Sequence, residues 1–422
     1  IKKFYPHCKI VLGGHHPTFF PEKVLTCPEV DFVLRGEGEK SMALLCDALK
    51  KGTDLKQIPG IAFKEKNSFY ISDPTWIKDF NRLSLPASDL INYNFYQRKN
   101  KSSIMVVSSR GCPMQCSYCS VSASSSHGPF RQRKIKDIIM EIKRQAEIHN
   151  IGFIDFEDEN LCLNKQWFLK LFLKIKKLFA DKNVELRAMN GLYPPAIDED
   201  IVSLMKASGF KALNLSLGST SKNQLKKFKR HDVTASFEHA LFLAEKYDLD
   251  CVSYIIAAAP GQTAQSSLED LLYLAQKRTL AGLSIYYPAP GSLDYQFCET
   301  NHMLPDHFSL MRSTAFPLNN TTSRIEAVTL LRLSRILNFM KYLIDTKGDI
   351  PESKPFCGQE KVSSLNRQAL SEELLQWFLH DGKIRGVDPG ERIYTHIADK
   401  SLTKKFINRI KTIPIAGIKK SV

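Results

Sequence analysis

Six short apolar runs, each followed by an amphipathic segment, dominate the chain from residue 103 onward. The runs are SIMVVSS (103–109), GFIDFED (152–158), VELRAMN (184–190), KALNLSL (211–217), CVSYIIAAA (251–259) and GLSIYYP (282–288). The intervening segments have helical spacing, as four isoleucines show: Ile135, Ile138, Ile139 and Ile142. Six strand-then-helix units predict an α/β fold with a parallel sheet and right-handed crossovers. Because eight such units close a full barrel, six predict an open, partial (β/α)6 barrel.

Three cysteines, Cys112, Cys116 and Cys119, follow the first run within eight positions. In parallel α/β barrels the functional site forms at the C-terminal ends of the strands, so these thiols occupy the position of a site. A structural zinc site needs four protein ligands, usually in two pairs, and the nearby His127 has no paired partner. Three thiolates instead suit a 4Fe-4S cluster in which one iron stays open to another ligand. The thiols therefore favour an iron–sulfur cluster over zinc.

The C-x3-C-x2-C spacing, with an aromatic residue just before the last cysteine, resembles the radical S-adenosylmethionine (radical SAM) superfamily. The resemblance extends over roughly residues 100 to 300. It implies that Cys112, Cys116 and Cys119 hold a 4Fe-4S cluster whose open iron chelates SAM. It also implies a SAM contact at Tyr118, the aromatic residue of the motif.

An acidic segment, FIDFEDENLCLN (153–164), covers the end of the second predicted strand. In the radical SAM superfamily the similar segment meets the amino group of SAM, which implies contacts at Asp158, Glu159 or Asn160. Carboxylates and an amide at a strand end suit an ammonium ion, because charge-assisted hydrogen bonds are strong. The alternative is an acidic helix start that complements the helix dipole, which accounts for the charges but not for their position.

Two further segments resemble SAM-binding motifs of the superfamily. NLSLGSTSKNQLKKFKR is similar to its fourth-strand motif, in which a Gly-x-Glu-Ser-Gly-Ser pattern helps to hold the SAM ribose. The departures from that pattern are Ser216, Gly218 and Thr220. Ser219 and Ser221 remain as hydroxyl contacts to the ribose. IIAAAPGQT resembles the I-x-G-x-P-G-E-T turn of the superfamily and implies a SAM contact at Ala258.

The first hundred residues carry a second resemblance. An apolar run ends in Gly13 and Gly14 within KIVLGGHHPTFFPEKVL, and such glycines either let a bulky ligand approach the backbone or simply form a tight turn. A second run leads into the turn of Gly36, Glu37 and Gly38 within VDFVLRGEGEKSMALLCDAL. The two segments resemble the C-terminal half of the Rossmann-like cobalamin-binding domain that precedes one large radical SAM class. The resemblance implies that these five residues contact cobalamin.

We expect four parts along the chain. They are the C-terminal part of a cobalamin-binding domain (1–55), a linker (56–100), the radical SAM core (101–310) and a helical C-terminal region (311–422). The last contains long amphipathic runs such as RIEAVTLLRLSRILNFMKYLID. The D-x-H-x-x-G motif, whose histidine binds cobalt in that class, does not occur. Because the sequence opens on Ile1 in a strand-like run, we expect a fragment whose upstream part contains the motif.

Composition limits the partners. The formal net charge is +15, and the basic clusters at 131–136, 226–230 and 400–411 follow helical patterns, which predicts solvated helix faces rather than a nucleic-acid surface. No apolar run approaches the roughly 18 to 20 residues of a membrane span. Ten cysteines without a secretory signal indicate a reducing compartment. We therefore expect a cytoplasmic protein in which most cysteines outside the motif are buried as small apolar residues.

The residues and the two resemblances together predict a cobalamin-dependent radical SAM enzyme, most simply a methyltransferase acting on an unactivated carbon. This function implies a 4Fe-4S cluster, SAM and cobalamin as cofactors, an electron donor such as flavodoxin or ferredoxin, and a small-molecule or peptide substrate. One alternative is a radical SAM enzyme of another type: a cyclase, a rearrangement enzyme or a methylthiotransferase. Methylthiotransferases need a C-terminal β-barrel, which the helical patterns here do not predict. The other alternative is a non-catalytic protein that binds zinc or cobalamin.

Overall fold

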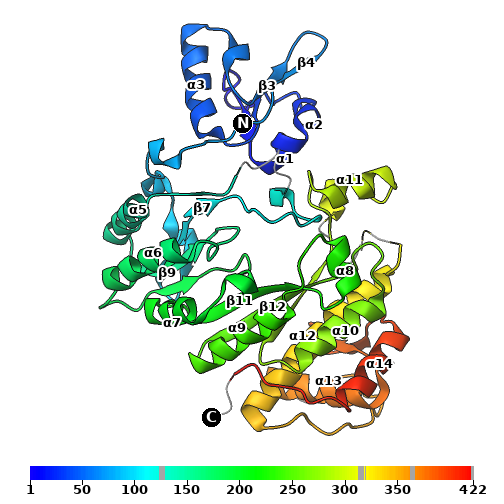
Figure 1. Ribbon diagram of the computed structural model, residues 1–422. Coiled ribbons are helices and arrows are strands. Elements are labelled where there is room, and N and C mark those ends of the chain that lie inside the picture. The colour runs from blue at the N-terminus through cyan, green and yellow to red at the C-terminus, as the bar shows by residue number, and fades with distance from the viewer. Residues whose placement is uncertain (123–128, 312–317, 319, 362–365, 420–422) are drawn as a thin grey trace.

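The six predicted strands form an open parallel arc. The computed structural model describes the chain except for residues 123–128, 312–317, 319, 362–365 and 420–422, so His127 lies outside the described residues. The strands are β6 (Lys101–Val106), β9 (Ile151–Phe156), β10 (Glu185–Arg187), β11 (Ala212–Gly218), β12 (Asp250–Ala257) and β13 (Leu280–Ile285). They pair in this order, with β10 and β11 joined through the isolated parallel bridges Leu186–Phe210 and Leu192–Leu215. Among the described residues no pairing returns from β13 to β6, and the predicted open (β/α)6 barrel is confirmed (Figure 1).

Helices cover the outer face of this arc. The main ones are α5 (Ile135–Ile148), α6 (Lys165–Leu178), α7 (Glu199–Ser208), α9 (Thr234–Lys246) and α10 (Ala264–Ala275). Alternate side chains of the strands, such as Ile104 and Phe156, are buried in one core with Ile138 and Phe172 of the helices. Burying each such side chain contributes about 1.5–3 kcal/mol, so this layer holds the strand ends, and with them the site, in place.

The opposite face of the strands lines the interior of the arc and is polar. The Arg187 guanidinium connects side chains of three strands on this face. Its Nε lies 2.7 Å from Oδ1 of Asp155, and its Nη2 donates to Oγ of Ser103 at 2.8 Å. Met105, which alternates with the buried Ile104 and Val106, lines a cavity and keeps 62% of its surface exposed. An interior with charged groups and an exposed thioether is not a packed core, unlike that of a closed barrel, and it leaves space for a ligand.

An N-terminal unit lies above the barrel (Figure 1). Its sheet has the order β1 (Val11–Gly13), β2 (Phe32–Leu34), β3 (Ile61–Lys64) and β4 (Phe69–Ile71), with β1 and β2 parallel. The helix α3 (Gly38–Lys51) buries Leu45 and Ala48 on one side of this sheet. The short helix α2 (Pro21–Leu25) buries Val24 and Leu25 in a separate cluster with Val33. Helices therefore cover both faces, as in the doubly wound domain that the sequence predicts.

The boundary between this unit and the connection differs from the expected one at residue 55. Strands β3 and β4 extend the N-terminal sheet, because Ile61 and Ala62 are fully buried and pair with Leu34 and Val33. Strand β3 has four residues and β4 has three, and turn-forming residues surround both. Such short strands show too little alternation of apolar and polar residues to be predicted from the sequence. The connection therefore covers 72–100, with the turns η2 (Phe80–Arg82), η3 (Ser88–Leu90) and η4 (Tyr93–Tyr96) before β5 (Gln97–Arg98), which pairs with β6.

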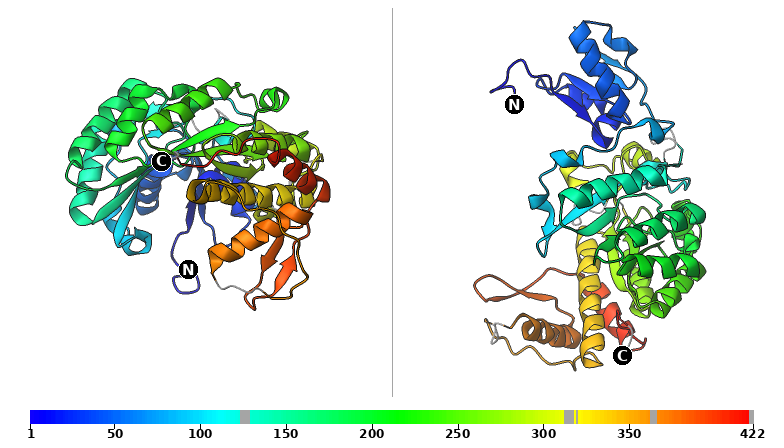
Figure 2. Two further views of the ribbon diagram at one scale, coloured as in Figure 1. Left: turned by 90° about the horizontal axis from the view of Figure 1, so that it is seen from below. Right: turned by 90° about the vertical axis from the view of Figure 1, so that its left-hand side faces the viewer.

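The C-terminal region covers the open edge of the arc. The long helix α12 (Arg324–Lys347) packs along β13. The right-hand view of Figure 2 shows this helix beside the barrel. Its Asn338 accepts from the backbone N–H of Ala281 at 2.8 Å and donates to the carbonyl of Ala281 at 2.9 Å. Because an edge strand otherwise leaves backbone groups unpaired, this amide protects the edge.

The rest of that region is largely helical, as predicted, in α13 (Arg367–Asp381) and α14 (Lys400–Ile410). An antiparallel pair, β14 (Arg385–Val387) with β15 (Ile393–Thr395), was not predicted, since three residues on each side give too little pattern. No helix among the described residues is long and apolar enough to cross a membrane.

Lys341 of α12 is fully buried and connects the C-terminal segment to the barrel. Its Nζ donates to the carbonyls of Ala275, Lys277 and Ala416 at 3.1, 2.7 and 2.9 Å. Burial lowers the pKa of Lys341 to about 7, because the charged form loses its hydration. The folded chain therefore loses a proton here at a pH where the unfolded chain still holds it.

The stability difference between the wild-type protein and Lys341→Met should therefore depend on pH. Between about pH 7 and pH 10 the unfolded chain binds one more proton than the folded chain, so wild-type stability rises with pH, by at most about 1.4 kcal/mol per unit. The variant lacks this term, and the melting temperatures of the two proteins should diverge from pH 7 to pH 9 in favour of the wild type. A difference that stays constant would show that the ammonium form persists.

Candidate functional site

The three motif cysteines lie on the loop that follows β6 and the two-residue strand β7 (Ser109–Arg110). Cys116 is buried, whereas Cys112 and Cys119 are partly exposed. Burial raises the pKa of Cys112, and the neighbouring thiols of Cys116 and Cys119 act in the same direction, so the three groups lie near one another. No three His, Cys, Asp or Glu side chains in the described part of the chain are close enough to hold one metal ion. The predicted cluster ligands thus gather on one loop without forming a single-ion site.

Asp158 anchors the start of this loop. Its carboxylate accepts from the backbone N–H of Ser108 at 3.2 Å, from Oγ of Ser108 at 2.7 Å and from Oγ of Ser109. Only 3% of Asp158 is exposed, and burial raises its pKa against the opposing effect of the serine donors. Its oxygens are engaged with the start of the loop, so the carboxylate positions the cysteine loop. The expected contact of Asp158 with the SAM amino group stays a prediction.

Glu159 and Asn160 lie on the other side of the same loop. Glu159 is half-buried, and its Oε2 accepts from the backbone N–H of Gly111 at 3.2 Å. Asn160 is buried, and its Nδ2 lies 3.9 Å from Sγ of Cys112. The Oδ1 atom of Asn160 is buried and has no hydrogen-bond partner among the described residues. Because buried acceptors are normally satisfied, an unpaired one beside a cluster thiol fits a missing ammonium donor, such as that of SAM.

The opposite side of the loop rests on residues that follow β11. The ring of Tyr118 packs edge-on against Phe228, with centroids 4.9 Å apart. Its hydroxyl accepts from Nη1 of Arg230 at 3.0 Å, and Nη2 of Arg230 donates to Oγ of Ser216 at 3.0 Å. Arg230 belongs to the basic cluster 226–230, for which the sequence predicted a solvated helix face. That prediction is wrong for Arg230, whose side chain turns inward to the cysteine loop.

The serines and the alanine expected to hold SAM do not face a cavity in this arrangement. Ser219 is fully buried, and its Oγ donates to Oδ2 of Asp270 at 2.7 Å. Ser221 caps the short helix α8 (Lys222–Lys227). Ala258 is fully buried, and its backbone N–H donates to a neighbouring serine hydroxyl. These groups shape the turns around the site, so direct contacts to SAM from Ser219 and Ala258 are not supported.

A cleft of about 380 Å³ separates the N-terminal unit from the cysteine loop. Gly14, Gly36 and Gly38 line it from the N-terminal unit, and Gly111 and Glu159 line it from the barrel. Two sets of residues that the sequence assigned to different cofactors therefore meet in one cleft. Gly14 has φ of 94°, and no atom lies within 4 Å of the position that its Cβ would take, so the space beside this glycine is open.

The other residues predicted to contact cobalamin have contacts within the protein, and two of them, Gly36 and Glu37, also line the cleft. A Cβ at Gly36 would lie 2.2 Å from the carbonyl oxygen of Thr75, so this glycine permits a close backbone approach. Gly13 is not among the residues that line the cleft. Glu37 is nearly buried between two arginines: its carboxylate lies 2.9 Å from Nη1 of Arg131 and 3.2 Å from Nη1 of Arg110. Glu37 therefore joins the N-terminal unit to the barrel.

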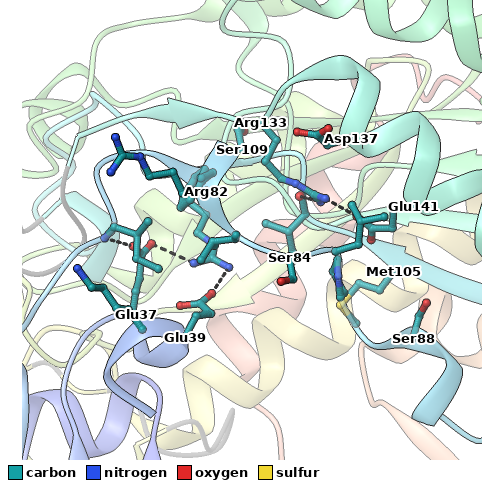
Figure 3. Close-up of a pocket in the computed structure, with 18 of the residues that line it drawn as sticks. Glu37, Glu39, Arg82, Ser84, Ser88, Met105, Ser109, Arg133, Asp137 and Glu141 are labelled. Atoms are coloured by element: carbon teal, nitrogen blue, oxygen red, sulfur yellow. Dashed lines mark hydrogen bonds and ion pairs between the residues drawn. The ribbon is translucent and has the colours of Figure 1, made fainter. Parts of the chain in front are cut away.

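A larger cavity of about 1460 Å³ adjoins the cleft and shares Glu37, Glu39 and Arg110 with it. Figure 3 shows Glu37 and Glu39 at one end, and Met105 and Glu141 at the other. Its walls come from the N-terminal unit, the connection 72–100, β6 and α5. Pockets for small ligands usually have about 300–1,000 Å³, so this cavity suits a bulky ligand or two ligands side by side.

Outside the motif, Cys162, Cys251 and Cys298 are buried, whereas Cys8, Cys27, Cys46 and Cys357 are exposed. The expectation that most of these cysteines are buried is therefore wrong, since isolated cysteines carry too little pattern to place them on an inner or outer face.

An open parallel barrel with three thiols on the loop after its first strand is the arrangement that the sequence predicted for a radical SAM domain. Residues 106–274 match the Radical SAM superfamily, and the chain carries a radical SAM domain. Domains of this superfamily use a 4Fe-4S cluster and SAM, which agrees with the predicted cofactors.

Several known proteins are similar to the chain. An uncharacterized methyltransferase of Pyrococcus horikoshii is 27% identical over 70% of this chain and 64% of its own length. The anaerobic magnesium-protoporphyrin IX monomethyl ester cyclase of Synechocystis is 27% identical over 59% of this chain and 50% of its own length. The chain therefore spans about half to two thirds of these curated relatives.

A solved structure shares the fold over most of the chain. The cobalamin-dependent radical SAM enzyme OxsB, with aqua-cobalamin and SAM bound, superposes with a TM-score of 0.53 at 14% identity. The match covers 94% of this chain and 52% of OxsB. It therefore includes the N-terminal unit as well as the barrel.

Replacing Cys116 with alanine should abolish cluster assembly. After anaerobic reconstitution the wild-type protein should hold about four irons per chain with broad visible absorbance, and the variant less than about one. Cys251→Ala is the matched control, because Cys251 is 2% exposed within β12 and should not affect iron content. Equal iron loss in both variants would refute the assignment of the ligands.

Proposed function

We propose that the chain is part of a cobalamin-dependent radical SAM methyltransferase that acts on an unactivated carbon. The observation that carries this proposal is the shared cleft, in which Gly14 and Gly38 face Gly111 and Glu159 of the barrel. When bound, the cluster and SAM would supply a 5′-deoxyadenosyl radical, and cobalamin would supply the methyl group. A cofactor in this cleft would lie next to the cysteine loop, as such a transfer requires.

The residues of the chain have distinct roles in this proposal. Cys112, Cys116 and Cys119 hold the cluster, and Asp158 fixes the loop that presents them. The unpaired Oδ1 of Asn160 accepts from the amino group of SAM. Because Arg230 donates to the hydroxyl of Tyr118, that ring keeps one orientation beside the loop. The N-terminal unit covers the barrel and excludes water from the reacting groups.

Two of the similar proteins support the choice of methyl transfer with cobalamin. The Pyrococcus relative is named a methyltransferase, and OxsB binds both aqua-cobalamin and SAM. The cavity of about 1460 Å³ beside the cleft offers space for a substrate next to the cofactors. An electron donor is also required, since reductive cleavage of SAM consumes an electron.

A cyclase is the second candidate, and the similarity to the Synechocystis cyclase over 255 residues favours it. The two functions differ in what becomes of SAM. A methyltransferase that regenerates its methyl carrier from SAM releases S-adenosylhomocysteine as well as 5′-deoxyadenosine. A cyclase without methyl transfer releases only the latter, so analysis of the SAM products separates the two.

Asn160→Ala should weaken SAM binding at least about tenfold, because the ammonium of SAM loses a buried, charge-assisted acceptor. The visible spectrum of the reconstituted cluster should not change, since the three cysteines remain. Asn164→Ala serves as the control, because Asn164 is exposed, caps α6 and bonds to Gln132 rather than to the cysteine loop. Titration of the reconstituted protein with SAM measures both affinities. If Asn160→Ala binds SAM with unchanged affinity, the proposed contact between Asn160 and SAM is wrong.

Gly14→Val should reduce cobalamin uptake by the full-length protein at least about tenfold. The branched side chain would fill the open space beside Gly14, which lines the cleft. Absorbance of bound cobalamin after desalting measures the uptake, and iron content shows whether the cluster is intact.

The matched control for this variant is Gly52→Val. Gly52 also has positive φ, of 66°, and open space where its Cβ would lie, but it ends α3 away from the cleft. Both variants strain the backbone, more strongly at Gly14 (φ 94°, ψ −167°) than at Gly52 (φ 66°, ψ 31°), and only the first obstructs the cleft. If the wild-type full-length protein takes up no cobalamin, or if both variants lose it equally, the methyltransferase proposal fails. The radical SAM domain itself would stand.

A further inference from the structure

Exposed lysines gather behind the cysteine loop, on α8 and the turn that follows it. Lys222, Lys226, Lys227 and Lys229 are all exposed. Within the described part of the chain, Lys222, Lys226 and Lys229 form no salt bridge. Two acidic groups interact with these lysines through their charges. Asp232 interacts with Lys222, and Asp294 interacts with Lys229. The local charge therefore remains strongly positive.

This basic segment is joined directly to the cysteine loop. The backbone N–H of Ser117 donates to the carbonyl of Phe228 at 2.9 Å, and its Oγ donates to the carbonyl of Lys227 at 3.0 Å. Ser117 is the residue next to Cys116, so these two hydrogen bonds join the lysine-bearing backbone to the neighbour of a candidate cluster ligand. Figure 1 shows α8 at the right-hand end of β11 and β12, below α11.

We propose that Lys222, Lys226 and Lys229 form the docking surface for an acidic one-electron carrier protein. This inference rests on the proposed function, because only a cluster on the three cysteines gives the electron an acceptor. In the transfer, one electron leaves the reduced iron–sulfur centre of the carrier and enters the cluster of this chain. No bond forms or breaks, and no proton moves.

The position of the lysines favours such a carrier. No residue of α8 lines the cleft or the large cavity, so a partner bound on α8 would leave both spaces unobstructed. Weak electron-transfer complexes need only small interfaces, below about 1,200 Å², and opposite charges steer their encounter. Single-stranded nucleic acid would need exposed aromatic side chains for stacking. The aromatic residue of this segment, Phe228, is only 1% exposed.

A charge-reversal experiment tests the surface. The variant Lys222→Glu/Lys226→Glu/Lys229→Glu is compared with Lys170→Glu/Lys174→Glu/Lys177→Glu, whose lysines are exposed on α6 and undergo the same change in net charge. The probe is an acidic ferredoxin, and its dissociation constant is measured by calorimetry at low ionic strength. We expect binding to weaken at least about tenfold in the first variant and to stay within about twofold in the second. Wild-type binding should weaken as salt is added, because salt screens exposed charges.

Cluster reduction gives a second readout. Dithionite is a small reductant that needs no docking, so it should bleach the cluster at the same rate in all three proteins. Reduction of the cluster by reduced ferredoxin should be slower only in the α8 variant. Equal effects of the two triple variants, or tighter binding of a mixed-sequence RNA oligonucleotide at the same lysines, would overturn the inference. If dithionite reduces the wild-type cluster but ferredoxin neither binds nor reduces it, the docking surface fails and the proposed function stands. Absence of any cluster in the wild type overturns both.

Discussion

The candidate site depends on one buried carboxylate. Asp158, just beyond the end of β9, accepts from the backbone and hydroxyl of Ser108 and from the hydroxyl of Ser109, which follow β6. A carboxylate that is 3% exposed is costly to bury unless its donors are all in place. The contact therefore fixes where the cysteine loop begins relative to the sheet. It also places Glu159 and Asn160, the next residues of the chain, against that loop.

Much of this fold could be predicted from the sequence, because its pattern is local. Short apolar runs between helical segments located all six barrel strands, and the cysteines marked the end of the first strand. Features that depend on tertiary contacts could not be predicted. Arg230 looks like its basic neighbours in the sequence, yet only its side chain turns inward, and its Nε would lie 3.3 Å from a Cβ at Gly218. The guanidinium thus lies beside the position where the family's motif has glutamate, so the departure at Gly218 and the inward turn of Arg230 belong together.

Ion pairs join the N-terminal unit to the barrel beside the start of the cysteine loop. Glu37, just before α3, lies between Arg110 and Arg131, and Arg110 directly precedes the cysteine loop. Both arginines also stack near the ring of Phe80 in the connection, at 4.9 and 4.8 Å from its centroid. A pair buried to this degree is costly to separate. The position of the N-terminal unit is therefore coupled to the start of the cysteine loop.

The exposed methionine inside the open arc has a further consequence for handling the protein. Met105 presents a polarizable thioether to the cavity, with 62% of its surface exposed. Oxidation converts methionine to a polar sulfoxide and changes both the shape and the hydrogen bonding of the side chain. Exposure to air would therefore damage more than an oxygen-sensitive cluster, because it would also make the barrel interior more polar. Protein reconstituted with iron after aerobic purification could regain its cluster and still hold an altered interior, which only reduction of the sulfoxide would restore.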